Sequence, residues 1–171
     1  MTNAQRKKRA TLAGGRLIGK LALFGVGLIG GSFALALKKR RAVGMVVGVG
    51  RSRANLSAAR RLGVIDEIAV DPAHAVRDAD LVLIAVPLGQ TAAVLASIAP
   101  HLAAHTVVSD AGSTKRDVIV AARRELGPAF ARFVPAHPIA GYGMPDYLRV
   151  SIGLETENER FLEALRQSLA A

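Results

Sequence analysis

The sequence contains no cysteine and no tryptophan, and only 4% of its 171 residues are aromatic. Without cysteine the chain forms no disulfide and no thiolate metal site, and we expect no bound metal. Hydrophobic residues nevertheless make up 51% of the chain, mainly alanine, valine, leucine and isoleucine. A core of small aliphatic side chains is typical of an α/β domain, and the length suffices for one such domain.

Acidic residues are missing from the first 20 residues, which hold six lysines and arginines and so supply six of the ten excess positive charges. This segment also lacks an apolar repeat, and we predict a disordered basic leader over residues 1–17. The other arginines are spread over predicted helices rather than gathered in one patch. We therefore expect no nucleic-acid partner.

One uncharged stretch, residues 21–37, has two interpretations. Its flanking lysines and the spacing of Gly27 and Gly31 are typical of a short membrane helix or of the apolar part of an export signal. Against both, the stretch has four glycines within seven positions, and each costs a helix about 1 kcal/mol. Its 17 residues also barely span a bilayer core of about 30 Å. We expect no membrane segment and a cytoplasmic protein.

Short apolar runs instead alternate with small-residue or amphipathic stretches between residues 20 and 136. We predict strands over 20–24, 45–49, 66–70, 80–87, 106–110 and 132–136, with intervening helices over 28–39, 53–62, 72–79, 91–103 and 114–126. The unbroken run at 80–87 is typical of a strand buried on both faces of a parallel sheet. The alternation predicts an α/β fold of the Rossmann type, a doubly wound parallel sheet that binds ligands at the carboxyl ends of its strands.

The first predicted strand ends in a glycine-rich turn, G-x-G-x-x-G, formed by Gly25, Gly27 and Gly30. In a dinucleotide-binding turn the first glycine permits a tight bend, the second lets the backbone approach a pyrophosphate, and the third lets the helix pack closely. Leu28 and Ile29 begin that helix, whose first amides and dipole favour phosphate. We predict a site for NAD or NADP here. The alternative is that the glycines serve only close packing.

An acidic residue is absent where an NAD site usually has one, about 20 residues after the glycines. The second predicted strand ends instead in Gly50, Arg51, Ser52 and Arg53. Cations and a hydroxyl can accept the 2′-phosphate of NADP, so this end favours NADP over NAD. The alternative is that both arginines are solvated loop residues. The cofactor cleft is further predicted to include three residues that follow the fourth strand: Val86, Pro87 and Gln90.

Five segments together resemble a known family: KLALFGVGLIGGS, GVGRS, ADLVLIAVPLGQT, SDAGSTK and PAHPIAG. They are similar to the nucleotide-binding domain of prephenate dehydrogenases and of the related arogenate and cyclohexadienyl dehydrogenases, over residues 18–141. The resemblance implies a Rossmann domain that binds NAD or NADP. It also implies a small-molecule substrate, prephenate or arogenate. The reaction that the resemblance implies is the oxidative decarboxylation of prephenate to 4-hydroxyphenylpyruvate, a step of tyrosine biosynthesis.

The same resemblance implies two catalytic residues. His137 would take the proton from the ring hydroxyl while hydride leaves the same carbon, and Ser113 would hydrogen-bond that hydroxyl or His137. Independently, an imidazole with a pKa near ~6.5 suits a general base, and His137 follows a predicted strand. Ser113 and Thr114 have an alternative role as N-caps of the next helix. Lys115 is a weaker candidate for binding.

After Gly141 the resemblance changes, and residues 142–171 are similar to the C-terminal end of histidinol-phosphate aminotransferases. We predict a strand and a helix there, in place of the helical domain through which the family dimerises and binds substrate carboxylates. The chain is interpreted as a leader, a Rossmann domain over 18–141 and this tail, with impaired turnover. The alternatives are a non-catalytic NAD(P)-binding or regulatory fragment and a membrane-anchored small protein.

Overall fold

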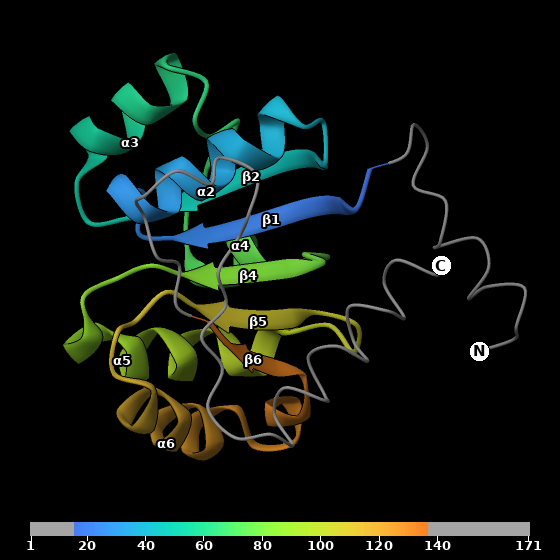
Figure 1. The fold of residues 1–171 in the computed structure, drawn as a ribbon, viewed down its shortest axis with the longest axis vertical. Coiled ribbons are helices and arrows are strands. Elements are labelled where there is room, and N and C mark those ends of the chain that lie inside the picture. Colours follow the sequence, from blue (N-terminus) through green and yellow to red (C-terminus); the bar gives the residue numbers. More distant parts are fainter. Residues whose placement is uncertain (1–15, 137–171) are drawn as a thin grey trace, which may run out of the picture.

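A computed structural model describes residues 16–136. Residues 1–15 of the predicted leader, His137 and the predicted C-terminal strand and helix lie outside the described residues. The leader was predicted to extend to residue 17, but Leu17 N–H already donates to the carbonyl of Ala42 at 3.1 Å. The described part is a six-stranded sheet in the order β3-β2-β1-β4-β5-β6, and each pair of neighbouring strands is parallel (Figure 1). This is the strand order of a doubly wound dinucleotide-binding sheet, so the predicted Rossmann-type fold is confirmed.

The predicted strands and helices between residues 18 and 136 are present, with changed ends. The strands are β1 (Ile18–Phe24), β2 (Val43–Val49), β3 (Glu67–Ile68), β4 (Leu81–Ile84), β5 (Val107–Asp110) and β6 (Phe133–Pro135). The helices are α2 (Leu28–Lys39), α3 (Arg53–Arg61), α4 (Pro72–Val76), α5 (Leu88–Ile98) and α6 (Lys115–Leu126), and two 3₁₀ turns, η1 (Ala99–His101) and η2 (Gly127–Arg132), follow α5 and α6.

The largest differences from prediction surround α5. The predicted strand over 80–87 is too long, because β4 ends at Ile84 and Pro87 is already the N-cap of α5. The helix therefore begins at Leu88 rather than at residue 91. It ends at Ile98, where Pro100 lies in the following 3₁₀ turn. Both shifts place a proline at a boundary, where its fixed φ and missing amide are tolerated.

Helices cover the two faces of the sheet in separate groups. Leu21 and Leu23 of β1 pack in a cluster with residues of α2 and α3, while Ala22 and Phe24 pack in a cluster with residues of α4, α5 and α6. These four side chains are at most 2% exposed. Burial on both faces explains why residues 21–24 of the central strand β1 are apolar at consecutive positions rather than alternating.

Residues 21–37 form part of β1, the glycine turn and most of α2 rather than one continuous helix. A single membrane helix over this stretch is therefore excluded, because β1 is hydrogen-bonded between β2 and β4. Among residues 16–136, no helix has the length and apolar character needed to cross a bilayer.

Candidate functional site

The loops after β1, β4 and β5 lie side by side along the carboxyl edge of the sheet. Backbone hydrogen bonds join the start of each loop to the end of the neighbouring strand: Gly25 N–H donates to the carbonyl of Val49 in β2, Ala85 N–H to that of Phe24 in β1, and Ala111 N–H to that of Ile84 in β4, at 2.9, 2.7 and 2.9 Å. From β1 the sheet extends in one direction through β2 and β3, and in the other through β4. Such a switch point is where ligands bind in doubly wound sheets, and the glycine turn lies there.

The three glycines of the turn have three different surroundings. Gly25 has φ +92°, and a Cβ added to it would lie 2.4 Å from the carbonyl oxygen of Ala85. A Cβ on Gly30 would lie 2.4 Å from the carbonyl oxygen of Gly25. A Cβ on Gly27 would meet no atom within 4 Å. The protein itself therefore requires glycine at positions 25 and 30, whereas the space beside Gly27 is open to a ligand.

We expect Gly25→Ala to lower the free energy of unfolding by about 2 kcal/mol or more, because it combines a left-handed backbone with a clash against a backbone oxygen. Gly27→Ala is the matched control, and its effect should stay within about 1 kcal/mol because only a preference at the helix N-cap changes. Urea denaturation followed by circular dichroism measures both values. Equal losses of stability would contradict this account of the turn.

The N-terminus of α2 presents free backbone donors. Its N-cap, Gly27, has no side chain, and the first turn contains no acidic residue. Leu28 is 87% and Ile29 43% exposed, so protein does not cover this end. By contrast, α3 is capped by the hydroxyl of Ser52 and α4 by the carboxylate of Asp71. An uncapped, exposed N-terminus after a glycine turn can bind a phosphate group.

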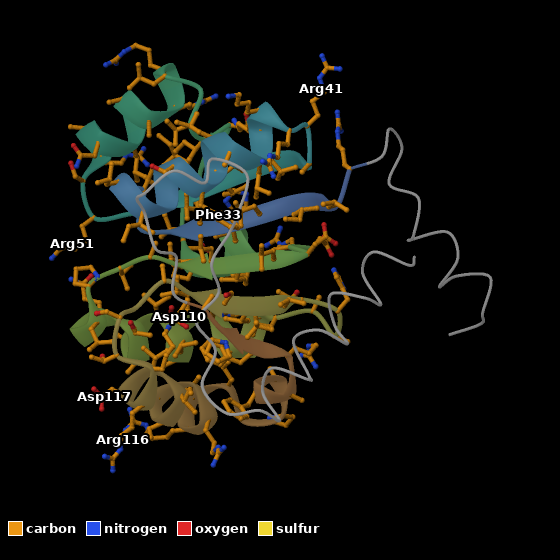
Figure 2. The ribbon with its side chains drawn as sticks, viewed as in Figure 1. Phe33, Arg41, Arg51, Asp110, Arg116 and Asp117 are labelled. Carbon is orange, nitrogen blue, oxygen red and sulfur yellow. The ribbon has the colours of Figure 1, made fainter. Side chains whose placement is uncertain are left out.

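The loop after β2 carries the residues that we predict to select the cofactor. Gly50, Arg51, Ser52 and Arg53 are all exposed. Arg51 extends from the side of the molecule toward which the strands point (Figure 2), and it makes no ion pair with the described residues. The Ser52 hydroxyl accepts a hydrogen bond from Asn55 N–H at 3.2 Å. Its own proton remains available to a ligand, so capping and phosphate binding are compatible.

The loop after β4 begins beside the glycine turn, where the backbone of Ala85 and Val86 lies next to Gly25, and its three predicted residues differ in burial. Val86 is half-buried and packs on the α4–α6 side of the sheet, and Pro87 is the exposed N-cap of α5. Gln90 is half-buried, and its N–H donates to the carbonyl of Pro87 at 2.8 Å. Leu88, which the sequence analysis did not single out, is 38% exposed at the start of α5.

Ser113 lies on the loop between β5 and α6, along the same edge as the glycine turn. Its side chain is exposed and makes no hydrogen bond within the part of the chain that the structure describes. The N-cap of α6 is Thr114, and no side chain caps this helix. Thr114 thus occupies the predicted N-cap position without a capping hydrogen bond from its side chain, and Ser113 is not the N-cap. The position of His137 lies outside the described residues, but Ala136, directly before it, is described.

Sequence reasoning missed Asp110, the last residue of β5. Its side chain is 2% exposed and pairs with the ammonium of Lys115, which is 16% exposed. Lys115 also donates to the carbonyl oxygen of Ala136. The ammonium is thus already bound within the protein, which argues against a direct role in ligand binding. The missed signal was an acid that ends an apolar strand five residues before a lysine.

A pocket at the other end of the strands contains none of the predicted site residues. It is lined by Arg16, Lys38, Arg41, Val43, Gly44 and Asp66. Figure 2 shows Arg41 on the side opposite Arg51. Of the remaining histidines within the described range, His74 lies 3.1 Å from Glu67 and His105 3.8 Å from Asp80. These contacts agree with ordinary structural or surface roles.

Comparison with known proteins identifies the family. Residues 33–147 match the family model described as prephenate dehydrogenase, nucleotide-binding domain. The chain belongs to this family. The matched segment begins just after the glycine turn and ends close to Gly141, where we expect the resemblance to stop. The prephenate dehydrogenase of Bacillus subtilis strain 168 is 40% identical over 122 residues, which cover 71% of this chain and 33% of that protein.

Solved structures agree on the fold of this prephenate dehydrogenase-family domain. The prephenate dehydrogenase of Aquifex aeolicus, in complex with hydroxyphenyl propionate and NAD⁺, superimposes with a TM-score of 0.66 at 24% identity, covering 88% of this chain and 57% of that chain. A second, short similarity is to histidinol-phosphate aminotransferase 2 of Pseudomonas aeruginosa, 53% identical over 51 residues, 28% of this chain and 14% of that protein. These similarities to two families agree with the prediction that a dehydrogenase-like domain is followed by a tail similar to histidinol-phosphate aminotransferases.

Proposed function

We propose that this chain binds NADP or NAD at the glycine turn and is the nucleotide-binding part of a dehydrogenase that acts on prephenate or arogenate. One observation carries the proposal: the open space beside Gly27, at the exposed and uncapped N-terminus of α2. A pyrophosphate fits this arrangement because the backbone donors face it and no side chain intervenes. The proposed substrate class, prephenate or arogenate, is taken from the family to which the chain belongs.

Residues of three loops would hold the cofactor. Gly25, Gly27 and Gly30 shape the turn, and the amides of Leu28 and Ile29 face the phosphates. Arg51 and Ser52 would bind the 2′-phosphate of NADP, and the cleft would be bounded by the residues after β4: Val86, Pro87 and Gln90. When bound, the nicotinamide accepts a hydride. The relatives of this domain include a structure named as a complex with NAD⁺, and the preference for NADP rests on Arg51 and Ser52.

The proposed reaction needs a base and a group that orients the substrate. His137 would accept the proton of the ring hydroxyl, and Ser113 would hydrogen-bond that hydroxyl or the imidazole of His137. Support for Ser113 comes from its exposed hydroxyl, which has no partner among residues 16–136. Support for His137 comes from Ala136, which is held at the same edge of the sheet by Asp110 and Lys115. Isothermal titration with both cofactors, followed by assay with prephenate, tests this function.

We expect NADP⁺ to bind the unmodified chain more tightly than NAD⁺, and Arg51→Asp to reverse that order. The exposed guanidinium would be replaced by a carboxylate, which repels a 2′-phosphate and accepts hydrogen bonds from a ribose hydroxyl. Isothermal titration should show a change of about tenfold or more in the ratio of the two dissociation constants, as for loss of one charged hydrogen bond. Arg61→Asp, at the opposite end of α3, controls for net charge. Tighter NAD⁺ binding by the unmodified chain would contradict the preference.

A second candidate is a cofactor-binding fragment without turnover. The observation that favours it is the short length of the match. The chain spans only 33%, 34% and 41% of the lengths of three dehydrogenase relatives. The two candidates share the cofactor site and differ only in the assay with substrate. Binding without any His137-dependent turnover would favour the fragment.

A further inference from the structure

The segment SDAGSTK contains more contacts than the proposed function uses. Asp110 is buried, at 1% exposure, and it is the centre of these contacts. One carboxylate oxygen, Oδ2, accepts from the ammonium of Lys115 and from Gly112 N–H at 2.8 Å. The other oxygen, Oδ1, accepts from Ala136 N–H at 3.3 Å. The carboxylate thus joins the end of β5, the start of α6 and the residue that follows β6.

Both backbone polar groups of Ala136 are bound by this ion pair. Its N–H donates to Asp110, and its carbonyl oxygen accepts from Lys115. That carbonyl belongs to the peptide bond between Ala136 and His137. Figure 2 shows Asp110 in the middle of the sheet edge, between the helices above and below it. The ion pair therefore holds both polar backbone groups of Ala136, the residue directly before His137 in the sequence.

Gly112 fits closely into the same arrangement. A Cβ at this position would lie 3.0 Å from Oδ2 of Asp110 and 3.2 Å from a methyl carbon of Val118. Any larger residue here would therefore require the carboxylate or Val118 to move by a few tenths of an ångström. The aspartate, the glycine two residues later and the lysine five residues after the aspartate thus form one unit.

Stability alone does not account for a buried ion pair. The penalty for removing two charges from water offsets much of their attraction, and apolar residues of similar volume often stabilise a fold as well or better. What the pair supplies, and apolar residues do not, is directional bonds to both polar groups of one residue. What the ion pair provides, and an apolar pair would not, is therefore a fixed position for Ala136.

We propose that Asp110 and Lys115 are positioning residues that hold the Ala136–His137 peptide in place, so that the proposed base enters the site from a fixed point. The inference rests on the proposed function only in the role given to His137. The contacts of Asp110, Lys115 and Ala136 are independent of that role.

The test uses the full 171-residue chain, uniformly labelled with ¹³C and ¹⁵N, without any ligand. His137→Asn assigns the imidazole signal of His137 among the four histidines. Lys115→Met removes the ammonium and keeps a similar volume, and Lys115→Arg keeps the charge. The chain also offers a matched control, Lys38→Met. Lys38 bridges Asp66 Oδ1 and the carbonyl of Gly63, at 2.6 and 2.9 Å, near the other end of the strands.

In Lys115→Met we expect the imidazole signal of His137 to move, while the signals of His74, His101 and His105 stay in place. Exchange of the Ala136 amide should become about tenfold faster or more, because the opening of this segment no longer breaks the lysine contact. Lys115→Arg should restore most of the His137 signal position. Lys38→Met should lower the melting temperature to a similar degree without moving the His137 signal.

Two results would overturn the proposal: a His137 signal that is unchanged in Lys115→Met, or one that moves equally in Lys38→Met. The second would show a general effect of lost stability. Isothermal titration of the unmodified chain with NADP⁺ and NAD⁺ is run beside these spectra. Absence of cofactor binding would contradict the proposed function and leave the spectroscopic result on Asp110 and Lys115 standing by itself.

Discussion

Replacing Gly27 by valine is expected to weaken the binding of NADP⁺ and NAD⁺ by at least about 100-fold, because the side chain would fill the space that the pyrophosphate needs. The position beside Gly27 is open to at least 4 Å in the protein alone. Its backbone has φ −104° and ψ −160°, an extended conformation that valine adopts readily. The chain should therefore fold, with its free energy of unfolding changed by no more than about 1 kcal/mol. Isothermal titration and urea denaturation measure the two quantities.

The control for this substitution lies one turn further along the same helix. A Cβ on Gly31 would meet a methyl carbon of Val64 at 3.5 Å, an ordinary contact on the side of the helix that faces the core. Gly31→Ala should leave both dissociation constants within about threefold of the unmodified values, and should add up to about 1 kcal/mol of stability through helix propensity. A folded Gly27→Val chain that binds either dinucleotide normally would place the pyrophosphate elsewhere.

The fold could be predicted from the sequence because its central strands carry an unambiguous pattern. Leu21 to Phe24 are buried on both faces of the sheet, so the run is apolar throughout, and the helix that follows it begins directly after Gly27. The errors lie at ends of elements. The apolar run continues through Val86 although β4 stops at Ile84. A loop residue that packs against the core is apolar like a strand residue, so the sequence does not distinguish the two.

The candidate site also has a part that could be predicted from the sequence and a part that could not. The glycine turn was predictable because each glycine answers a local steric demand, or leaves a local space, within a few residues of β1. The bonds between Asp110, Lys115 and Ala136 were not predictable, since Ala136 lies 26 residues beyond Asp110. Their meeting depends on the parallel register that pairs Asp110 of β5 with Pro135 of β6. Lys115 therefore looked like a free cation in the sequence and is a paired one in the fold.

The second large effect is expected in turnover. The purified 171-residue chain should bind a dinucleotide but oxidise prephenate slowly or undetectably, because prephenate carries two carboxylates that need cationic partners. The resemblance to prephenate dehydrogenases places those arginines in the helical domain, beyond the family's nucleotide-binding domain. Loss of one charged hydrogen-bonding partner costs roughly 1.5–3 kcal/mol. Loss of two lowers kcat/KM by on the order of 10²–10⁴.

Any remaining turnover should depend on His137. In His137→Asn the side chain keeps its polarity and approximate size but cannot accept a proton near neutral pH, so the residual rate should disappear while cofactor affinity stays the same. His105→Asn is the matched control, because His105 lies beside Asp80 near the start of β4 and should not affect the rate. Cofactor reduction followed at 340 nm measures all three chains. A kcat above about 1 s⁻¹, an ordinary enzymatic value, in the unmodified chain would mean that these 171 residues contain the whole substrate site. The carboxylates would then be bound by cations of this chain, and Arg116, the exposed arginine that follows Ser113 most closely in the sequence, would be the first to replace.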